Sequence, residues 1–387
     1  MDITVVVALV IALALFFDFT NGFHDTANAM ATPIATGALK PKVAVLIAAV
    51  LNLVGAFLST EVAKTISGGL IREGADGILI TPQMIFAGLV GEIVWNLITW
   101  LLGLPSSSSH ALLGGLIGAT VVGAGFGAID PIVLLSKIVL PALFAPVIAG
   151  VVAFVATKLA LLITRNSTPS QAGFKVGQIF TSSLVSLAHG TNDAQKTMGV
   201  ITLTLVAAGF QANGTGPEFW VIVVCALAIA FGTYMGGWRI IRTLGTGITD
   251  VSPPQGFAAE ASTTATILAS SHLGFALSTT QVASGSVIGA GLGKDRRSVR
   301  WRIAGRIAVG WLITLPAAGL MAAGAELIAR IETVGLFIDA AIGAVVILVI
   351  FLRSRRNRVS HHNVTHPVPV APQATPTDAP KKKAGAR

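Results

Sequence analysis

The chain contains 387 residues, of which 53% are hydrophobic and only 11% are charged. Soluble domains carry about 25% charged residues, so this composition excludes a water-soluble globular enzyme and predicts an all-α integral membrane protein that sits in a lipid bilayer. The formal net charge of +9 arises from two basic clusters, at 294–306 and 353–387. Both clusters flank apolar segments, which disfavours a nucleic-acid partner and indicates the cytoplasmic ends of membrane helices.

The apolar segments, taken in chain order, predict about seven full transmembrane spans. A helix needs about 20 predominantly apolar residues to cross a bilayer. The segments that meet or approach this length are 4–39, 43–60, 131–163, 176–210, 219–237, 303–329 and 334–352.

Two further apolar regions, 83–126 and 256–292, are each interrupted by a run of small hydroxyl residues. The runs are Pro105-Ser106-Ser107-Ser108-Ser109 and Ser278-Thr279-Thr280. Positively charged loops mark the cytoplasmic side, and by this rule the first region begins and ends outside whereas the second begins and ends inside. Each region therefore crosses the membrane an even number of times. We predict two re-entrant helical hairpins with the hydroxyls at their tips; two full crossings in each region is the alternative.

Several motifs of the first half recur in the second half. Gly22-Phe23-His24-Asp25 aligns with Gly190-Thr191-Asn192-Asp193, and the two hydroxyl runs align at nearly the same offset in residue number. Because the two halves have opposite predicted topology, the chain is interpreted as an inverted-repeat secondary transporter whose site lies between the repeats. The predicted organisation is a first repeat (1–163), a cytoplasmic linker (164–175), a second repeat with closing helices (176–352) and a disordered basic cytoplasmic tail (353–387).

Ionisable side chains within the predicted spans are few. Such groups are costly inside a bilayer and usually face a cavity or a partner. Asp25 pairs with Asp193 across the repeat, and Glu92 pairs with Glu260 at the same offset. We predict a functional role for the aspartates, whereas functional and structural roles are equally open for the glutamates. Asp18 has no counterpart in the second half and is interpreted as structural.

The hydroxyl runs indicate the class of substrate. A helix N-terminus presents free N–H groups and a partial positive charge, so it favours an anion. Two such tips facing each other would surround a tetrahedral oxyanion with donors; the simpler alternative is that the hydroxyls only cap helices and pack closely. The predicted donors are Ser107, Ser108, Ser109, Ser278, Thr279 and Thr280.

These motifs resemble the paired signatures of the PiT inorganic phosphate transporter family. The resemblance runs from about residue 4 to residue 352, and its motifs occur in the family's order at Gly22 to Ala29, Pro105 to His110, Ala188 to Lys196 and Leu277 to Gln281. It implies phosphate symport across the cell (inner or plasma) membrane, driven by a cation gradient. The implied site combines the hydroxyls with Asn28, Asn192, Asp25 and Asp193, and it requires no cofactor, catalytic residue or resident metal.

Departures from the sodium-coupled members of the family concern the coupling ion. Those members have Asn-Asp-x-x-Asn in both halves, whereas the halves here read His24-Asp25-Thr26-Ala27-Asn28 and Asn192-Asp193-Ala194-Gln195-Lys196. The Lys196 ammonium could replace a bound cation, and His24 can change charge near neutral pH. Both features resemble the bacterial, low-affinity, proton-coupled branch. We therefore predict phosphate import by proton symport, with Asp25, Asp193, His24, Lys196, Glu92 and Glu260 in coupling.

Four alternatives remain at this point. They are a sulfate or other oxyanion permease on the same scaffold, sodium-coupled phosphate symport, a passive anion channel, and an intramembrane hydrolase with a Ser–His pair at 106–110. The hydrolase is disfavoured because no oxyanion-hole motif accompanies the pair and the second hydroxyl run is followed by Gln281 instead of a His. The sequence leaves open whether a metal–phosphate complex is carried and whether the protein is a homodimer.

Overall fold

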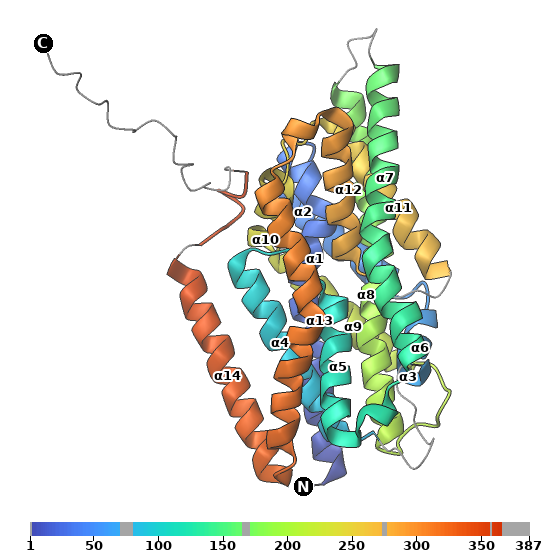
Figure 1. Ribbon diagram of the computed structural model, residues 1–387, viewed down its shortest axis with the longest axis vertical. Helices are drawn as coiled ribbons and strands as arrows, with labels where there is room; N and C mark the ends of the chain where they lie inside the picture. Colours follow the sequence, from blue (N-terminus) through green and yellow to red (C-terminus); the bar gives the residue numbers. More distant parts are fainter. Residues whose placement is uncertain (1, 70–79, 165–170, 273–276, 357, 366–387) are drawn as a thin grey trace, which may run out of the picture.

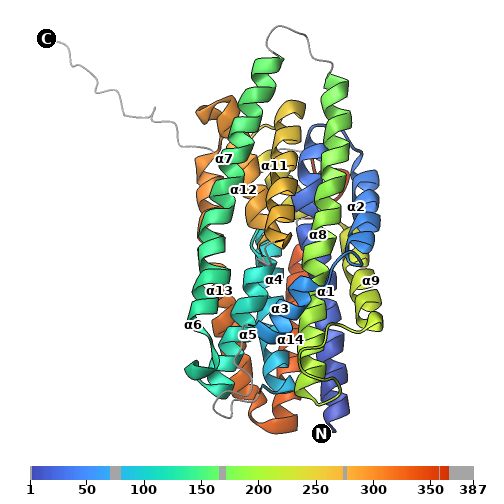
Figure 2. The same cartoon turned by 90° about the vertical axis from the view of Figure 1, so that its right-hand side faces the viewer.

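The computed structural model describes residues 2–69, 80–164, 171–272, 277–356 and 358–365. Every regular element within these ranges is a helix, which confirms the all-helical prediction (Figures 1 and 2). Half of the predicted linker at 164–175 and most of the predicted tail at 353–387 lie outside the described residues.

The α-helices follow one another along the chain with short 3-10 or π turns between some of them. The α-helices are α1 (Ile3–Ala35), α2 (Pro41–Gly55), α3 (Glu61–Gly69), α4 (Pro82–Leu102), α5 (Ser108–Ala124), α6 (Pro131–Val133), α7 (Leu140–Ile163), α8 (Gln171–Ala207), α9 (Phe219–Met235), α10 (Trp238–Arg242), α11 (Pro253–His272), α12 (Thr279–Lys294), α13 (Trp301–Ala329) and α14 (Glu332–Arg356). The short turns are η2 (Phe126–Ala128), η3 (Leu134–Val139), η4 (Thr243–Gly247) and η5 (Arg296–Ser298).

The chain is a multi-pass membrane protein by the length and apolarity of its helices. Within the described ranges, 5 helices can cross a membrane, or 6 if α9 and the segment Trp238–Gly247, bent by 56°, form one span. Helix α2 has only 15 residues and ends at Gly55, earlier than the predicted span 43–60. Helix α8 has 37 residues but is not among these membrane-crossing helices. It is less apolar than they are, because the Asp193 motif and several hydroxyl residues lie within it.

Two helix pairs enter the molecule from opposite ends. Helices α4 and α5 pack together, and so do α11 and α12. The end of α4 and the start of α5 reach the middle of the molecule from the end that contains the N-terminus, and the start of α12 reaches it from the other end (Figures 1 and 2). The two hydroxyl runs therefore meet near the centre, beside the long helices α1 and α8.

The second helix of each pair packs against a long helix from the other half of the chain. Helix α5 lies along α13, and α12 lies along α7. Glycines allow this close approach, because a Cβ atom at Gly118 would overlap the carbonyl oxygen of Gly319, and one at Gly289 would overlap that of Gly150. Gly118 and Gly289 are related by the same offset in residue number as the hydroxyl runs. The two halves are therefore interlocked through corresponding contacts.

Candidate functional site

The candidate site lies where α1 and α8 pass the starts of α5 and α12. Asp25 on α1 and Asp193 on α8 are 2% and 0% exposed, so both carboxylates are removed from solvent. The hydroxyl residues at the two helix starts are also buried. The structure thus brings together the motif residues that the sequence analysis paired between the two halves of the chain.

The hydroxyls at the helix starts donate to the aspartates in a corresponding pattern. Ser108 Oγ donates to Asp25 Oδ2 at 2.8 Å, and Thr279 Oγ1 donates to Asp193 Oδ2 at 3.0 Å. Thr280 Oγ1 also donates to Asp25 Oδ1 at 3.1 Å, from the hairpin of the other half. Each aspartate is therefore joined to the tip of the hairpin from its own half, and Asp25 is joined to both tips.

Asn28 and Lys196 occupy corresponding positions three residues after the two aspartates. Asn28 Nδ2 donates to Thr279 Oγ1 at 3.3 Å and to Thr280 Oγ1 at 3.1 Å. Lys196 Nζ donates to Ser109 Oγ at 2.5 Å and forms an ion pair with Asp193. The Lys196 side chain is 2% exposed, so its ammonium remains in the site and does not extend to water. Each long helix thus uses this position to reach the opposite hairpin.

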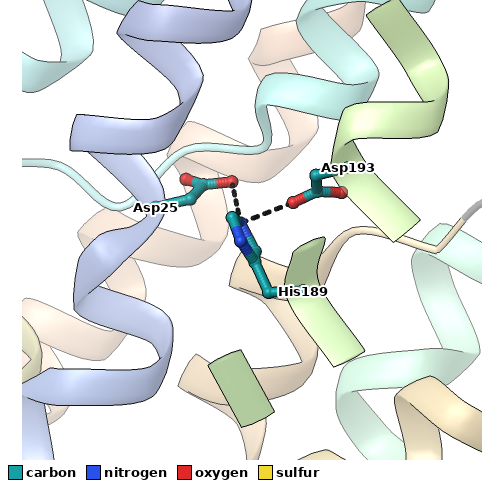
Figure 3. A group of neighbouring side chains, drawn as sticks. All are labelled: Asp25, His189 and Asp193. Atoms are coloured by element: carbon teal, nitrogen blue, oxygen red, sulfur yellow. Dashed lines mark ion pairs between the residues drawn. The ribbon is translucent and has the colours of Figure 1, made fainter. Parts of the chain in front are cut away.

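His189 connects the two aspartates and was not among the site residues chosen from the sequence. Its Nε2 lies 2.7 Å from Asp193 Oδ2 and 3.8 Å from Asp25 Oδ2 (Figure 3). A signal for this role was present, because His189 precedes Asp193 by four residues and therefore lies on the same face of α8. The contact with Asp25 depends on how α1 and α8 pack, which residue spacing does not reveal.

Asp25, His189 and Asp193 are also arranged so that they could hold a cation. Each offers one ligand atom, and these atoms lie within 4.8 Å of one another. Carboxylate oxygens and an imidazole nitrogen suit several cations. The sequence analysis expected no resident metal at this place. The Lys196 ammonium already neutralises part of the negative charge of Asp193, which lowers the affinity of this set for a further cation.

His24 and His110 have different contacts. His24 Nδ1 lies 2.6 Å from Asp25 Oδ1, so His24 belongs to the site as the sequence analysis expected. His110 Nδ1 lies 3.3 Å from Nε2 of Gln281, its counterpart in the second half. The two residues that follow the hydroxyl runs therefore contact each other across the meeting point of the hairpins.

Ser107 and Ser278 differ from the other hydroxyl residues. Ser107 Oγ accepts from the backbone N–H of His110 at 3.1 Å, and Ser278 Oγ accepts from that of Gln281 at 3.3 Å. Both are helix N-caps, so the simpler interpretation of capping describes these two positions. Asn192 contacts the second hairpin as well, since its Nδ2 donates to the carbonyl of Leu277 at 3.3 Å.

Neither glutamate accepts a hydrogen bond or forms an ion pair that links it to the aspartates, and the environments of the two glutamates differ. Glu260 accepts hydrogen bonds from Thr32, from Gln178 Nε2 at 3.3 Å and from Thr181 Oγ1 at 2.7 Å. Glu92 is 0% exposed, and neither of its carboxyl oxygens has a hydrogen-bond partner among the described residues. The equivalence that the sequence offset indicates therefore does not extend to their surroundings.

Comparisons with known proteins identify relatives of this chain. A family profile described as the Phosphate transporter family matches residues 21–322, a range that contains all the site residues above. The chain belongs to this family. This membership confirms the resemblance drawn from the four motifs.

Relatives and a solved structure extend the comparison. A protein named "Probable low-affinity inorganic phosphate transporter" in Mycobacterium tuberculosis is 54% identical, over 92% of this chain and 86% of the relative. A Bacillus subtilis protein of the same name is 40% identical, over 84% of this chain and 97% of the relative. A structure titled "The sodium-dependent phosphate transporter" superposes with a TM-score of 0.75 at 24% identity, covering 85% of this chain and 100% of that chain. This last similarity shows a shared fold.

Proposed function

We propose that this chain imports inorganic phosphate across the cell membrane by proton symport through alternating access. The observation that carries the proposal is the central cluster in which hydroxyls from two opposed hairpins face Asp25 and Asp193. Donors and acceptors that alternate around one point suit a ligand that both accepts and donates hydrogen bonds. Protonated phosphate is such a ligand.

The balance of donors and acceptors favours phosphate over sulfate. Sulfate carries no proton near neutral pH, so it can only accept hydrogen bonds. A carboxylate beside the hydroxyls would repel sulfate without gaining a hydrogen bond, whereas it can accept one from the O–H of phosphate. In this proposal Ser108, Ser109, Thr279 and Thr280 hold the anion, with Asn28 and Asn192 next to them. Ser107 and Ser278 shape the helix starts by capping.

The ion pair between Lys196 and Asp193 supports proton coupling over sodium coupling. The buried ammonium supplies a positive charge within the site without any bound metal ion. The remaining groups that the proposal assigns to coupling are Asp25, Asp193, His24, Glu92 and Glu260.

The corresponding contacts of the two halves support an inverted repeat with about seven spans and two re-entrant hairpins. Paired features include the hydroxyl contacts to the aspartates, the glycine contacts of α5 and α12, and the turns η2 and η5. In this arrangement the basic segment at 294–306 and the C-terminal tail are cytoplasmic.

Uptake of radiolabelled phosphate into proteoliposomes tests the function directly. The pH gradient and the sodium gradient are imposed separately, with empty liposomes as the control. We expect accumulation with an inward proton gradient, no stimulation by sodium, and little competition from excess sulfate. Accumulation that requires sodium, or that is abolished by equimolar sulfate, contradicts the proposal. Repeating the assay with a chelator shows whether free phosphate or a metal–phosphate complex is carried.

Cysteine labelling tests the inverted repeat. Gly127 in η2 and Ser298 in η5 are related by the same offset as the hydroxyl runs and lie in solvent-accessible turns. Gly127→Cys and Ser298→Cys are made in a Cys225→Ala background, because Cys225 is the only cysteine of the chain. We expect an impermeant maleimide to label the first only from outside and the second only from inside. Labelling of both from the same side would reject the inverted repeat.

A further inference from the structure

We propose that Asp18 is a proton-binding residue that couples phosphate import to the proton gradient. This inference rests on the proposed function and deepens it, because it assigns the transported proton to one carboxyl group outside the paired motifs. The sequence analysis interpreted Asp18 as structural, and its surroundings in the structure do not support that interpretation.

Asp18 is buried without a partner. It lies on α1 seven residues before Asp25, which is about two helical turns nearer the N-terminus. Its side chain is 0% exposed, and neither carboxyl oxygen has a hydrogen-bond partner in the part of the chain that the structure describes. A carboxylate with a purely structural role would be held by donors of the kind that contact Glu260.

Two further buried polar groups near Asp18 in sequence or space share this property. The side-chain nitrogen and oxygen of Asn21, one turn along α1, have no partner among the described residues, and the same holds for the hydroxyl of Thr197 on α8. Thr197 lies next to Asp18 across the interface between the two helices. Native proteins satisfy almost all buried polar groups, so a cluster of this kind needs an explanation. A protonated carboxyl group has one O–H donor, and Thr197 Oγ1 can accept a hydrogen bond from it.

The protonation of Asp18 follows from its burial. An ionised carboxylate in an apolar interior without hydrogen bonds or a directly paired counter-ion is strongly disfavoured, and such a group becomes neutral instead. Asp25 and Asp193 differ, because Lys196, His189, His24 and the hydroxyls stabilise their ionised forms. A carboxylate that is already paired is a poor acceptor for a transported proton. Asp18 is the better acceptor on these grounds.

The charged groups around Asp18 connect its protonation to the substrate site. Helix α8 places Asp193, His189 and Lys196 within electrostatic range of Asp18, and α9 contributes Cys225. Glu92 on α4 interacts with Asp25 instead. Adding or removing a proton at Asp18 therefore changes the electrostatic potential at Asp193, His189 and Lys196, which form the α8 part of the site.

The same groups favour a proton over a metal ion. The oxygens of Asp18, Asn21 and Thr197 could in principle surround sodium, but the Lys196 ammonium nearby repels a second cation. In the proposed cycle the Asp18 carboxylate takes a proton from hydronium in the external water when phosphate enters from outside, so an O–H bond of hydronium breaks as the O–H bond at Asp18 forms. That bond breaks after the site has opened to the cytoplasm, and the proton passes to water. Monovalent phosphate and one proton then move together without net transfer of charge.

The substitution Asp18→Asn separates coupling from substrate movement. The amide resembles the protonated carboxyl group but cannot release a proton. Proteoliposomes containing the variant are tested for two activities: exchange of internal for external phosphate at equal pH, and accumulation driven by an inward proton gradient. We expect exchange within about twofold of wild type and accumulation reduced about tenfold or more, because exchange requires no proton release. The dependence of uptake on external pH should flatten as well.

Two further variants make the test decisive. Asp339→Asn is the matched control, since Asp339 is a carboxyl group on α14 that is only 2% exposed and belongs to no part of the site; it should retain both activities. Asp18→Glu keeps a titratable group and should retain accumulation with a displaced pH profile. Proton-driven accumulation of wild-type size in Asp18→Asn overturns the proposal. Loss of exchange in both Asp18→Asn and Asp18→Glu also overturns it and assigns Asp18 to structure.

The wild-type protein distinguishes failure of this inference from failure of the proposed function. If wild-type vesicles do not exchange phosphate, the substrate is wrong and both proposals are rejected. If they accumulate phosphate only with sodium, phosphate transport stands while proton coupling, and with it the role of Asp18, is rejected.

Discussion

Asp25 and Asp193 occupy corresponding positions on α1 and α8, but the charges around them differ. Asp193 forms an ion pair with Lys196 and has His189 at 2.7 Å. The nearest partners of Asp25 are His24 and two neutral hydroxyls. The second half of the site therefore has a built-in cation in Lys196, whereas the first half has an imidazole and neutral hydroxyls beside its aspartate. Duplicated motifs can thus place two aspartates in corresponding positions while giving them neighbours of different charge.

The glutamates show the same difference between the halves. Glu260 is held by three side chains, whereas Glu92 has no partner among the residues that the structure describes. The partners of Glu260 are Thr32, Gln178 and Thr181, and the offset that relates Glu92 to Glu260 pairs them with Val200, Val10 and Leu13. These aliphatic side chains offer no hydrogen bond. The residues at these corresponding sequence positions therefore differ in polarity between the halves.

The largest expected effect is that of Lys196→Asn, which makes the second half resemble the first. Removing one partner of a buried ion pair costs about 3–5 kcal/mol, so we expect a roughly hundredfold or greater loss of phosphate uptake at neutral pH. Acidic pH should restore part of the uptake, because Asp193, having lost the ammonium beside it, then takes up a proton more readily. Added sodium should also restore it if the cation enters the space that the ammonium leaves. Radiolabelled phosphate uptake as a function of pH and sodium measures each effect.

Lys196→Arg is the matched control for this substitution. It keeps the positive charge and should remain independent of sodium, although its larger head group fits the contact with Ser109 less well. If Lys196→Asn shows the pH dependence of wild type and no response to sodium, the built-in cation is not what separates the two halves. Phosphate transport itself would remain as proposed.

A second comparison concerns the hydroxyls Ser108 and Thr279, which contact Asp25 and Asp193 in the same way. A hydrogen bond to a charged group contributes about 1.5–3 kcal/mol, so Ser108→Ala and Thr279→Ala should each weaken apparent phosphate affinity roughly tenfold. Similar losses in both variants would show that the two hairpins contribute equally to the anion site. The measurement is the concentration dependence of initial uptake rates.

Ser136→Ala provides the control for loss of a hydroxyl. Ser136 is exposed and donates to the carbonyl of Ile132 within its own helical segment, away from the site. Its substitution should leave the affinity unchanged. Unchanged affinity in both Ser108→Ala and Thr279→Ala would show that the hydroxyl runs only cap helices and pack closely.

Residue patterns predicted much of this site because the family motifs are repeated. The pairs Asp25–Asp193 and Ser108–Thr279 were predicted from constant offsets, and the structure brings them together. The bridging position of His189 was not predicted, because it depends on the distance between α1 and α8. The isolation of Asp18 was missed for the same reason, since its missing partners would have to come from other helices. Residue spacing along one helix shows which side chains share a face. It does not show which residues of other helices that face contacts.

Helix packing offers a third test of the correspondence between the halves. Gly118 meets Gly319 and Gly289 meets Gly150 so closely that a methyl group overlaps a carbonyl oxygen in both places. Overpacking of this kind typically costs about 1–3 kcal/mol, and we expect Gly118→Ala and Gly289→Ala to lower thermal stability by similar amounts. Gly343→Ala on α14 is the control, because no atom lies within 4 Å of the added methyl group. Strongly unequal effects would show that the two crossings are not equivalent.

The smallest expected effect compares Glu260→Gln with Glu92→Gln. The amide of Gln keeps one acceptor oxygen but replaces the other with a donor, so the Thr181 hydroxyl must accept instead of donate or one of the three bonds is lost, at a cost of up to about 1 kcal/mol. Glu92 has no such bonds among the described residues, so Glu92→Gln should change stability less. Thermal unfolding of the two variants in the same detergent measures the difference. Equal destabilisation would mean that Glu92 has polar partners of its own, for instance ordered water. The two halves would then differ less around their glutamates than around their aspartates.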